Sequence, residues 1–189
     1  MKLDYLKMKS DIKDIYQTKK NERDKFITAL DSKSFDFQIA TWFGSGLIIP
    51  ASGTWGTIGG ILLGIPLLLA TNSLIVLLVA FALFFIGLKS VERIEKQLSD
   101  HDPSFIVIDE VVAILICIAM LPKDYFYTTL IIVFGLFRYF DAKKPWLIGY
   151  ADKKIKGAMG VMVDDIVAAA FSLFVLWLIL FISIFFLFL

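Results

Sequence analysis

Apolar and charged residues are strongly segregated along this chain. No Asp, Glu, Lys or Arg occurs in residues 37–88 or in residues 166–189. A helix that crosses a membrane needs about 20 predominantly apolar residues, so the first stretch can hold two spans and the second can hold one. A third apolar region, residues 104–140, is interrupted by the turn sequence Pro122-Lys123-Asp124. The pattern predicts an all-α, polytopic membrane protein with four to five spans, at about residues 57–70, 73–88, 104–121, 125–140 and 161–189.

The beginning of the first apolar stretch is rich in residues that interrupt helices. Between residues 39 and 57 lie Gly44, Gly46, Pro50, Gly53 and Gly56. A straight helix through this segment is not expected, and irregular backbone at membrane depth is tolerated only where protein or a polar cavity surrounds it. We expect a glycine-rich re-entrant or interfacial loop that leads into the first span near residue 57.

Residues 1–36 differ from the rest of the chain because acidic and basic side chains are interspersed there. Ile12, Ile15 and Tyr16 fall at helical spacing among them. This pattern predicts one or two amphipathic helices in the cytoplasm or on the membrane surface. The sequence therefore divides into a charged amphipathic N-terminal arm, residues 1–36, and a membrane domain, residues 37–189.

Composition supports the membrane assignment, and the basic residues orient the protein. The chain of 189 residues is 58% hydrophobic and only 20% charged, whereas soluble domains have about 45–50% apolar and about 25% charged residues. All 19 Lys and Arg residues except Lys123 fall before the first predicted span, between the second and third, or at and after the end of the fourth. Because basic loops tend to stay in the cytoplasm, we expect the N-terminus there and the C-terminus outside.

Three groups of ionisable residues lie at the cytoplasmic ends of the predicted spans. They are His101-Asp102 with Asp109-Glu110, Arg138 with Asp141 and the neighbouring lysines, and Asp164-Asp165. Ionisable groups at the edge of a span are costly and mark functional sites. Carboxylates gathered at one membrane surface repel unless a cation lies among them, and oxygen ligands with few histidines suit Mg²⁺. The alternative is that Arg138 and the lysines neutralise the acids through salt bridges.

The glycine-rich loop has features of an anion site. Glycines let the backbone approach a phosphate closely, and Gly56-Thr57 leads into a helix whose N-terminal amides would face the anion. Close helix packing in membranes selects the same small residues. Taken alone, this signal fits a phosphate site and a packing surface equally well.

Several classes of phosphatase lack the residues that their chemistry requires. His101 is the only histidine, which excludes a histidine nucleophile assisted by a second histidine. Cys117 lies within a predicted span and is followed by Lys123 where a cysteine phosphatase needs an Arg. With one Cys and one His, zinc hydrolysis also lacks ligands. Metal-assisted attack on a phosphate ester by water or by an Asp remains.

Four motifs carry a resemblance to a known family. They are Gly44-Ser45-Gly46 with Gly53-Thr54-x-Gly56, His101-Asp102 with Asp109-Glu110, Arg138-x-x-Asp141-x-x-Lys144-Pro145, and Gly157-x-x-Gly160-x-Met162-x-Asp164-Asp165. Their order and spacing resemble those of phosphatidylglycerophosphatase A. The resemblance implies a Mg²⁺-dependent phosphatase of the bacterial inner membrane that converts phosphatidylglycerophosphate to phosphatidylglycerol in phospholipid biosynthesis. The chain departs from the usual pattern at Ser52 and Leu147, which replace prolines, and at Ala113, Ala158 and Ala169, which replace glycines.

The motifs and the resemblance together define a candidate site at the cytoplasmic face. The candidate Mg²⁺ ligands, directly or through water, are Asp109, Glu110, Asp141, Asp164 and Asp165. The same carboxylates are the catalytic candidates, together with His101 as an acid or base. The phosphate-binding candidates are Arg138, Lys144, Gly53, Thr54 and Ser45.

The expected partners are a phospholipid phosphate substrate and membrane lipids. Nucleic acid is not expected, and an oligomer is compatible with the sequence. Two other functions fit part of the pattern. A small ion or solute transporter would place acidic residues through the depth of the bilayer, whereas the acidic pairs here map to one face. An inactive membrane scaffold would keep the fold without the chemistry.

Overall fold

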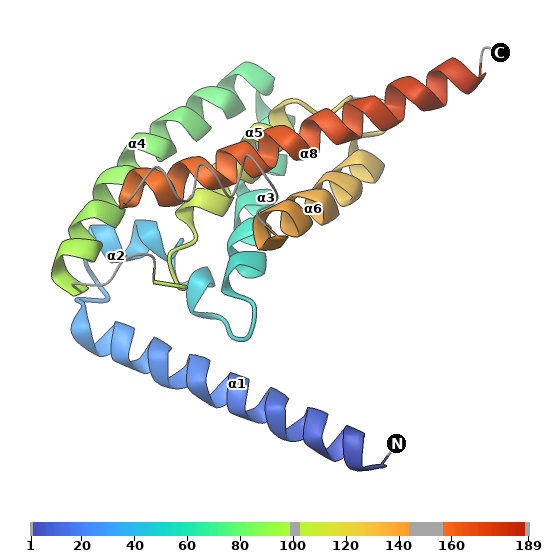
Figure 1. Ribbon diagram of the computed structural model, residues 1–189. Coiled ribbons are helices and arrows are strands. Elements are labelled where there is room, and N and C mark those ends of the chain that lie inside the picture. The colour runs from blue at the N-terminus through green and yellow to red at the C-terminus, as the bar shows by residue number, and fades with distance from the viewer. Residues whose placement is uncertain (1, 99–102, 144–156, 188–189) are drawn as a thin grey trace.

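The computed structural model describes residues 2–98, 103–143 and 157–187, in which helices are connected by turns and short irregular segments. No strand occurs among them. The elements, shown in Figure 1, are α1 (Lys2–Ala29), α2 (Phe35–Ala40), the short 3-10 helix η1 (Ser45–Leu47), α3 (Ser52–Ala70), α4 (Ser73–Leu98), α5 (Ile108–Ala119), α6 (Phe126–Lys143) and α8 (Ala158–Leu187). The predicted all-α class is confirmed.

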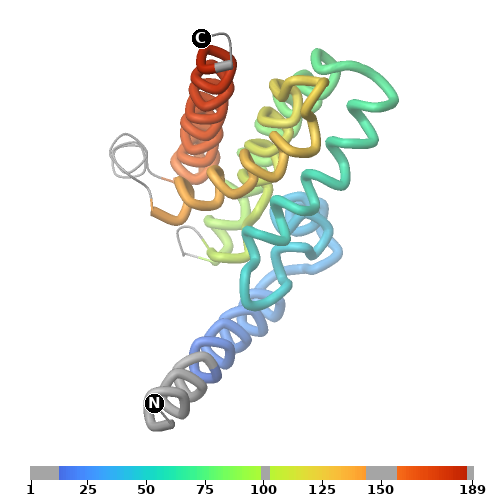
Figure 2. The backbone as a smooth tube through the Cα atoms, turned by 90° about the vertical axis from the view of Figure 1, so that its right-hand side faces the viewer, coloured from blue at the N-terminus to red at the C-terminus, as the bar shows by residue number. Residues whose placement is uncertain are grey.

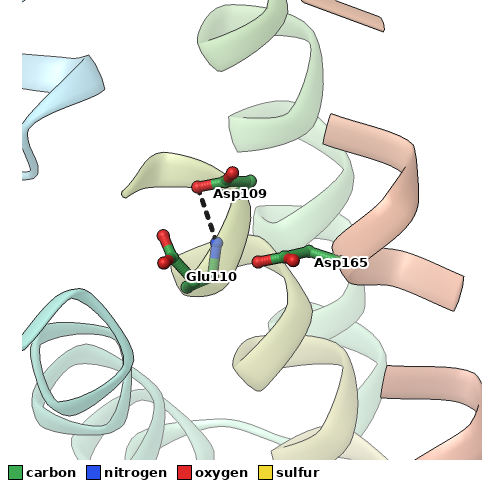
Figure 3. A group of neighbouring side chains, drawn as sticks. All are labelled: Asp109, Glu110 and Asp165. Carbon is green, nitrogen blue, oxygen red and sulfur yellow. Dashed lines mark hydrogen bonds between the residues drawn. The ribbon is translucent and has the colours of Figure 1, made fainter. Parts of the chain in front are cut away.

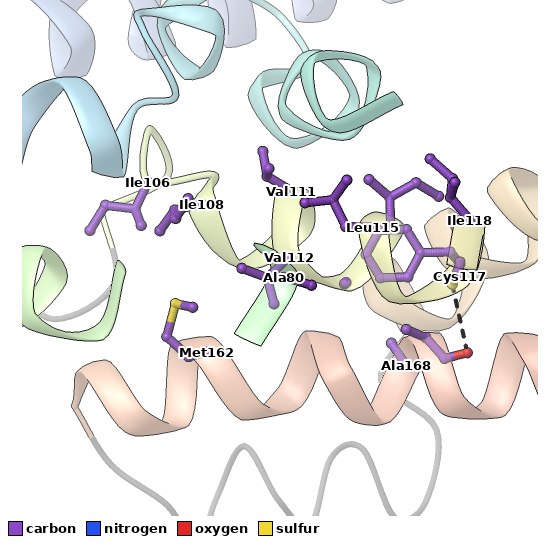
Figure 4. Close-up of a cluster of buried hydrophobic side chains, with 14 of the residues drawn as sticks. Ala80, Ile106, Ile108, Val111, Val112, Leu115, Cys117, Ile118, Met162 and Ala168 are labelled. Atoms are coloured by element: carbon purple, nitrogen blue, oxygen red, sulfur yellow. Dashed lines mark hydrogen bonds between the residues drawn. The ribbon is translucent and has the colours of Figure 1, made fainter. Parts of the chain in front are cut away.

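Helix α5 forms the centre of the fold although it has only 12 residues. All of them except Ile116 are buried, because α3, α4 and α8 pack around the helix. Figure 4 shows Val111 and Leu115 of α5 in one apolar cluster with Ala80 of α4 and Met162 of α8. A side chain at the beginning of α5 is therefore held by neighbours on several sides.

Glycines bring α3 close to α5. A Cβ added at Gly60 would collide with Ile114, and one added at Gly64 would lie 2.6 Å from Ile118 Cδ1. Small residues at such a contact let two helices approach closely within a membrane. The register of these contacts makes the two helices parallel, so the first turn of α3 lies beside the first turn of α5.

The outer surfaces of the bundle are apolar. Leu62 on α3, Phe81 on α4 and Phe181 on α8 are all largely exposed, and extended apolar exteriors mark surfaces that contact something other than water. Among the described residues, α3, α4 and α8 are long and apolar enough to cross a membrane. The chain is a helical membrane protein, as the sequence predicts.

The number of spans is not fixed by these three helices. The predicted spans at 104–121 and 125–140 correspond to α5 and α6, which do not meet the same criteria of length and composition. Helix α5 alone is about 18 Å long, whereas the hydrocarbon core of a bilayer is about 30 Å thick. Five spans therefore stay a prediction.

The segment between α2 and α3 is irregular, as its glycine and proline residues predict. It turns at Trp42, Phe43 and Gly44, which have positive φ, and then forms η1. The predicted beginning of the first span near residue 57 is wrong, because α3 already begins at Ser52. Gly53 therefore lies in the first turn of a helix, where backbone N–H groups have no partner within the helix.

Helix α1 is one continuous helix that extends away from the bundle (Figure 2). Its C-terminal end is fixed to the domain, because Phe26 and Leu30 are buried and the Phe26 ring packs against the rings of Phe37 and Phe105. The predicted boundary between the arm and the membrane domain, at residues 36–37, falls within α2. The arm is thus joined to the apolar core shortly before that boundary.

Candidate active site

Two acidic pairs from helices distant in the sequence meet at the N-terminal ends of α5 and α8. Asp109 and Glu110 lie in the first turn of α5, and Asp164 and Asp165 lie in the second turn of α8. All four residues are buried, with between 4% and 8% of their surface exposed. Carboxylate oxygens of Asp109, Glu110 and Asp165 lie within 4.8 Å of one another (Figure 3). The structure therefore brings both helices to one buried acidic cluster.

The first acid of each pair accepts a hydrogen bond from the backbone of the second. Glu110 N donates to Asp109 Oδ1 at 3.0 Å, and Asp165 N donates to Asp164 Oδ1 at 3.0 Å. On α5 this bond holds Asp109 against an amide of the first turn, which has no partner within the helix, whereas Asp165 N belongs to the second turn of α8. The second acids are satisfied less completely, because Glu110 Oε2 and Asp165 Oδ2 are buried without a hydrogen-bond partner in the described part of the chain.

Arg138 adds a positive charge to this cluster from the C-terminal part of α6. Its Nη1 lies 2.9 Å from Asp141 Oδ2 and 3.7 Å from Glu110 Oε1. Arg138 and Asp141 are three residues apart, so they share one face of α6. Arg138 thus connects Asp141 to the acidic cluster on α5.

Gly53 occupies a position where no side chain fits. A Cβ added there would collide with Glu110 Oε1 and lie 2.9 Å from Arg138 Nη2. The backbone at the beginning of α3 therefore lies directly on the Glu110–Arg138 pair. Because the first N–H groups of a helix lack partners within it and carry partial positive charge, this turn adds an anion-compatible edge to the acidic cluster.

The structure separates the predicted phosphate-binding residues. Gly53 and Arg138 lie at the cluster, and Thr54 follows Gly53 in the same helical turn. Ser45 lies elsewhere, since its Oγ donates to the Thr41 carbonyl oxygen and sits beside Gly59, further along α3. The predicted His101 and Lys144 lie outside the described residues.

Sequence reasoning noted Ser52 only as a departure from a family pattern, but the side chain has a structural role. Ser52 Oγ donates a 2.6 Å hydrogen bond to the Ser104 carbonyl oxygen. Val107 N, in the same segment, donates to the Ala40 carbonyl oxygen at 2.8 Å. These bonds fix the chain that leads into Asp109. Proline at position 52 could not make the first of them, because it has no hydroxyl group.

Negative charges outnumber positive charges among the described residues of the cluster. Asp109, Glu110, Asp141 and Asp165 gather around a single described cation, Arg138. Buried carboxylates that outnumber their cationic partners destabilise one another. The unpartnered oxygens of Glu110 and Asp165 are suitable ligands for a divalent cation that prefers oxygen.

The length of α8 gives the depth of the cluster. From Ile166 to Leu187 the helix contains no charged residue, and at 1.5 Å per residue this stretch is about 33 Å long. The hydrocarbon core of a bilayer is about 30 Å thick. If α8 crosses it, Asp165 lies at the boundary between hydrocarbon and head groups.

Comparison with known proteins identifies the family. Residues 38–180 match the family model of phosphatidylglycerophosphatase A. The chain belongs to this family. The match begins within α2 and includes every described residue of the acidic cluster, while α1 lies outside it. Membership of the phosphatidylglycerophosphatase A family makes the chain an enzyme, a lipid phosphatase of the membrane, and confirms the resemblance seen in the motifs.

Individual relatives agree with the family match. Phosphatidylglycerophosphatase A of Haemophilus influenzae is 37% identical over 139 residues, which cover 74% of this chain and 85% of the relative. Its namesake in Escherichia coli is 33% identical over 141 residues, covering 75% and 81%. A Bacteroides thetaiotaomicron protein, provisionally named a phosphatidylinositol-3-phosphatase, is 35% identical over 143 residues, covering 71% and 86%. No solved structure matches the chain.

Proposed function

We propose that this phosphatidylglycerophosphatase A family member is a Mg²⁺-dependent phosphatase that hydrolyses phosphatidylglycerophosphate to phosphatidylglycerol and inorganic phosphate. The observation that carries the proposal is the buried group of Asp109, Glu110 and Asp165 with Arg138 beside it. This arrangement supports the proposal because the carboxylates could hold a cation and Arg138 could bind a phosphate. The reaction would serve phospholipid biosynthesis at the cytoplasmic face of a bacterial inner membrane.

The names of the relatives support a lipid monophosphate as the substrate. Two of them are phosphatidylglycerophosphatases, and the third is provisionally named a phosphatidylinositol-3-phosphatase. Both names describe removal of a phosphate from a lipid head group. Phosphatidylglycerophosphate is favoured because the relative with the highest identity among the three carries that name.

The donor set fits Mg²⁺. Asp109, Glu110 and Asp165 would hold the ion, with water completing its octahedral shell, because Mg²⁺ prefers carboxylate oxygens and retains several waters. When bound, the ion would stabilise negative charge on the phosphoryl oxygens and template the attack. The salt-bridge alternative accounts for Asp141, which pairs with Arg138, but not for the unpartnered oxygens of Glu110 and Asp165.

Arg138 and the first turn of α3 would bind the phosphate. Arg138 presents a fork of N–H donors that matches two phosphate oxygens. Because Gly53 has no side chain, the first turn of α3 lies directly against Glu110 and Arg138, and its free N–H groups would lie beside a phosphate that Arg138 binds. If water attacks phosphorus, a carboxylate of the cluster takes a proton from it, the bond from phosphorus to the glycerol oxygen breaks, and that oxygen takes a proton from the protonated carboxyl or from water. If an Asp attacks instead, the same bond breaks, and water then hydrolyses the phosphoaspartate to release inorganic phosphate.

The structure favours an enzyme over a transporter. The carboxylates of Asp109, Glu110, Asp141 and Asp165 converge at one end of the bundle, whereas an ion path requires polar groups through the depth of the bilayer. The distribution of basic residues supports a cytoplasmic position for that end. Phosphate release without ion flux in proteoliposomes would separate the two functions.

The test is phosphate release by the purified full chain in detergent micelles. We expect rapid hydrolysis of short-chain phosphatidylglycerophosphate with Mg²⁺, slower hydrolysis of phosphatidylinositol 3-phosphate, and no hydrolysis in EDTA until Mg²⁺ is restored. Full activity in EDTA would exclude the metal mechanism. A preference for the inositol lipid would keep the chemistry but overturn the proposed substrate.

A further inference from the structure

Helix α1 lies outside the region matched to the family, yet one of its faces combines apolar and basic side chains. Ile15, Lys19, Arg23, Phe26 and Leu30 follow one another at intervals of three or four residues, and Tyr16 lies three residues before Lys19. All six therefore lie on one face of a helical path. Phe26 and Leu30 at one end of this face are buried against the domain. At the other end, Ile15 is 58% exposed and Tyr16 is 46% exposed. The face therefore continues beyond the protein surface that covers its C-terminal end.

The charges of α1 are divided between this face and the rest of the helix. Lys19 and Arg23 lie between the exposed Tyr16 and the buried Phe26. The acids Asp14 and Asp24 point away from that face by helical geometry, although Arg23 also pairs with Asp24 at 2.8 Å. Glu22, seven residues after Ile15, lies at the edge of the face and offsets part of its positive charge. Basic residues beside an aromatic and an aliphatic side chain are typical of a helix at a lipid interface.

We infer that the face of α1 formed by Ile15, Tyr16, Lys19 and Arg23 docks on the anionic lipid surface of the membrane in which the domain is embedded. Charge complementarity selects this occupant, because Lys and Arg attract anionic head groups while Ile15 and Tyr16 enter the interface. The assignment to the cytoplasmic leaflet rests on the proposed function.

The attachment of α1 keeps this face close to lipid. The Phe26 ring packs against Phe105 at a centroid distance of 5.7 Å, and Phe105 lies three residues before the beginning of α5, which carries Asp109 and Glu110. The arm thus leaves the domain at the same end as the acidic cluster, which α8 places at the hydrocarbon boundary. Exposure of Ile15 and Tyr16 to water does not stabilise the helix, whereas burial of these side chains in a lipid interface does.

The experiment places one spin label on this face and one beside it. Tyr16→Cys and Gln17→Cys point about 100° apart on the helix, and the native Cys117 is buried, so labelling is confined to the new thiol. The labelled full-length proteins are reconstituted in phosphatidylcholine vesicles with or without 30% phosphatidylglycerol. Collisions with oxygen and with a water-soluble nickel complex report the depth of each label.

We expect the label at position 16 to lie at lipid depth only in the anionic vesicles, and the label at position 17 to remain in water in both. A label at position 16 that stays aqueous in the anionic vesicles would overturn the inference. Equal depth in neutral vesicles would overturn the electrostatic part of it. Protection in detergent without lipid would identify a second copy of the chain as the occupant.

A charge-matched pair of variants tests which basic residues act. Replacing Lys19 and Arg23 by Gln should lower the ratio of docked to undocked label roughly 30-fold, about 5-fold for each charge. The same replacement at Lys13 and Lys25, which lie off the face, should lower that ratio far less. Equal losses would overturn the assigned face. The label reports docking without turnover, so failure of this inference is distinct from failure of the proposed reaction.

Discussion

Helices α5 and α8 each carry a pair of adjacent acids, but the two helices are held in the fold in different ways. In each helix, the first acid of the pair accepts the backbone N–H of the second. Helix α5 has 12 residues and is surrounded by protein, whereas α8 has 30 residues and exposes much of its surface. The beginning of α5 is fixed by hydrogen bonds from outside the helix, through Ser52 and Val107. Helix α8 is held mainly by apolar packing along its length.

This difference indicates a division of labour within the cluster. Helix α5 contributes a rigid platform from which Asp109 and Glu110 both reach the group, while α8 contributes Asp165 from the edge of a membrane span. The second acids retain unpartnered oxygens, and the first acids organise the local turns. Substitutions in α5, in α8 and at their contacts with α3 and α6 test whether the two helices and the two acids of each pair have these different roles.

The largest effect is expected at the second acid of α8. Asp165→Asn preserves the shape of the side chain but removes its charge. We expect phosphate release to fall roughly 10³-fold, because in the proposed mechanism this carboxylate would hold the cation that stabilises the transition state. The measurement is the initial rate with short-chain phosphatidylglycerophosphate and excess Mg²⁺.

Asp164→Asn is the matched control within the same turn of α8. Asp164 lies outside the 4.8 Å group and accepts the Asp165 N–H, so we expect a loss of only about tenfold, as for residues that orient a ligand. Equal losses in the two variants would contradict the proposed division between first and second acids.

The second largest effect is expected where Gly53 of α3 contacts Glu110 of α5. Gly53→Ala introduces a Cβ that collides with Glu110 Oε1 and crowds Arg138. We expect kcat/KM to fall roughly 10²-fold, since displacement of a catalytic group by about 1 Å has that consequence. Rates and thermal unfolding of the purified protein in detergent would be measured together.

Gly135→Ala on α6 controls for the general effect of a methyl group on a helix. A Cβ at position 135 would meet no atom within 4 Å. We expect unchanged activity and a gain of up to about 1 kcal/mol in stability, because Ala favours helix over Gly. If Gly135→Ala lost as much activity as Gly53→Ala, crowding at Glu110 would not be the cause.

A smaller change is expected from Arg138→Lys. Lysine keeps the positive charge but loses the fork that can bind two phosphate oxygens. We expect KM to rise about tenfold with kcat changed less, as for loss of one hydrogen bond to a charged group. A fall in kcat at constant KM would instead place Arg138 in transition-state stabilisation alone.

The smallest effect is expected at the entry to α5. Ser52→Ala removes the 2.6 Å hydrogen bond to the Ser104 carbonyl oxygen and should lower stability by about 1 kcal/mol. On α8, Ser183→Ala removes only an exposed bond to the Ile179 carbonyl oxygen of its own helix and should change stability little. A larger loss of stability in Ser183→Ala than in Ser52→Ala would contradict the view that hydrogen bonds from outside the helix matter for α5 and not for α8.

Much of this site follows from local sequence. Adjacent acids next to long apolar runs identify the beginnings of buried helices, and the i,i+3 spacing of Arg138 and Asp141 predicts their proximity on one helix. The family resemblance adds the order of the motifs. These signals are short in range, so they are present in the chain before folding.

The remaining features depend on contacts between distant segments. Which acid of Asp164-Asp165 joins the group is decided by the rotation of α8 against α5, because adjacent residues point about 100° apart. The position of Gly53 over Glu110 requires the glycine contact between α3 and α5, and the early beginning of α3 was missed because glycine and proline nearby favour a loop. Ser45 belongs to the same glycine-rich motif as Gly53, but the turn at residues 42–44 places it beside Gly59, away from the acidic cluster.

The uncharged length of α8 has an energetic consequence for the proposed substrate. Extracting a phospholipid with two acyl chains exposes about 30 methylene groups to water, and at about 0.8 kcal/mol each this amounts to more than 20 kcal/mol. A cluster that lies at the end of the uncharged stretch of α8, about 33 Å long, would remove the need for that step. The lipid can diffuse sideways within its own leaflet, present its phosphate to Asp165 and Arg138, and leave with its acyl chains still in hydrocarbon.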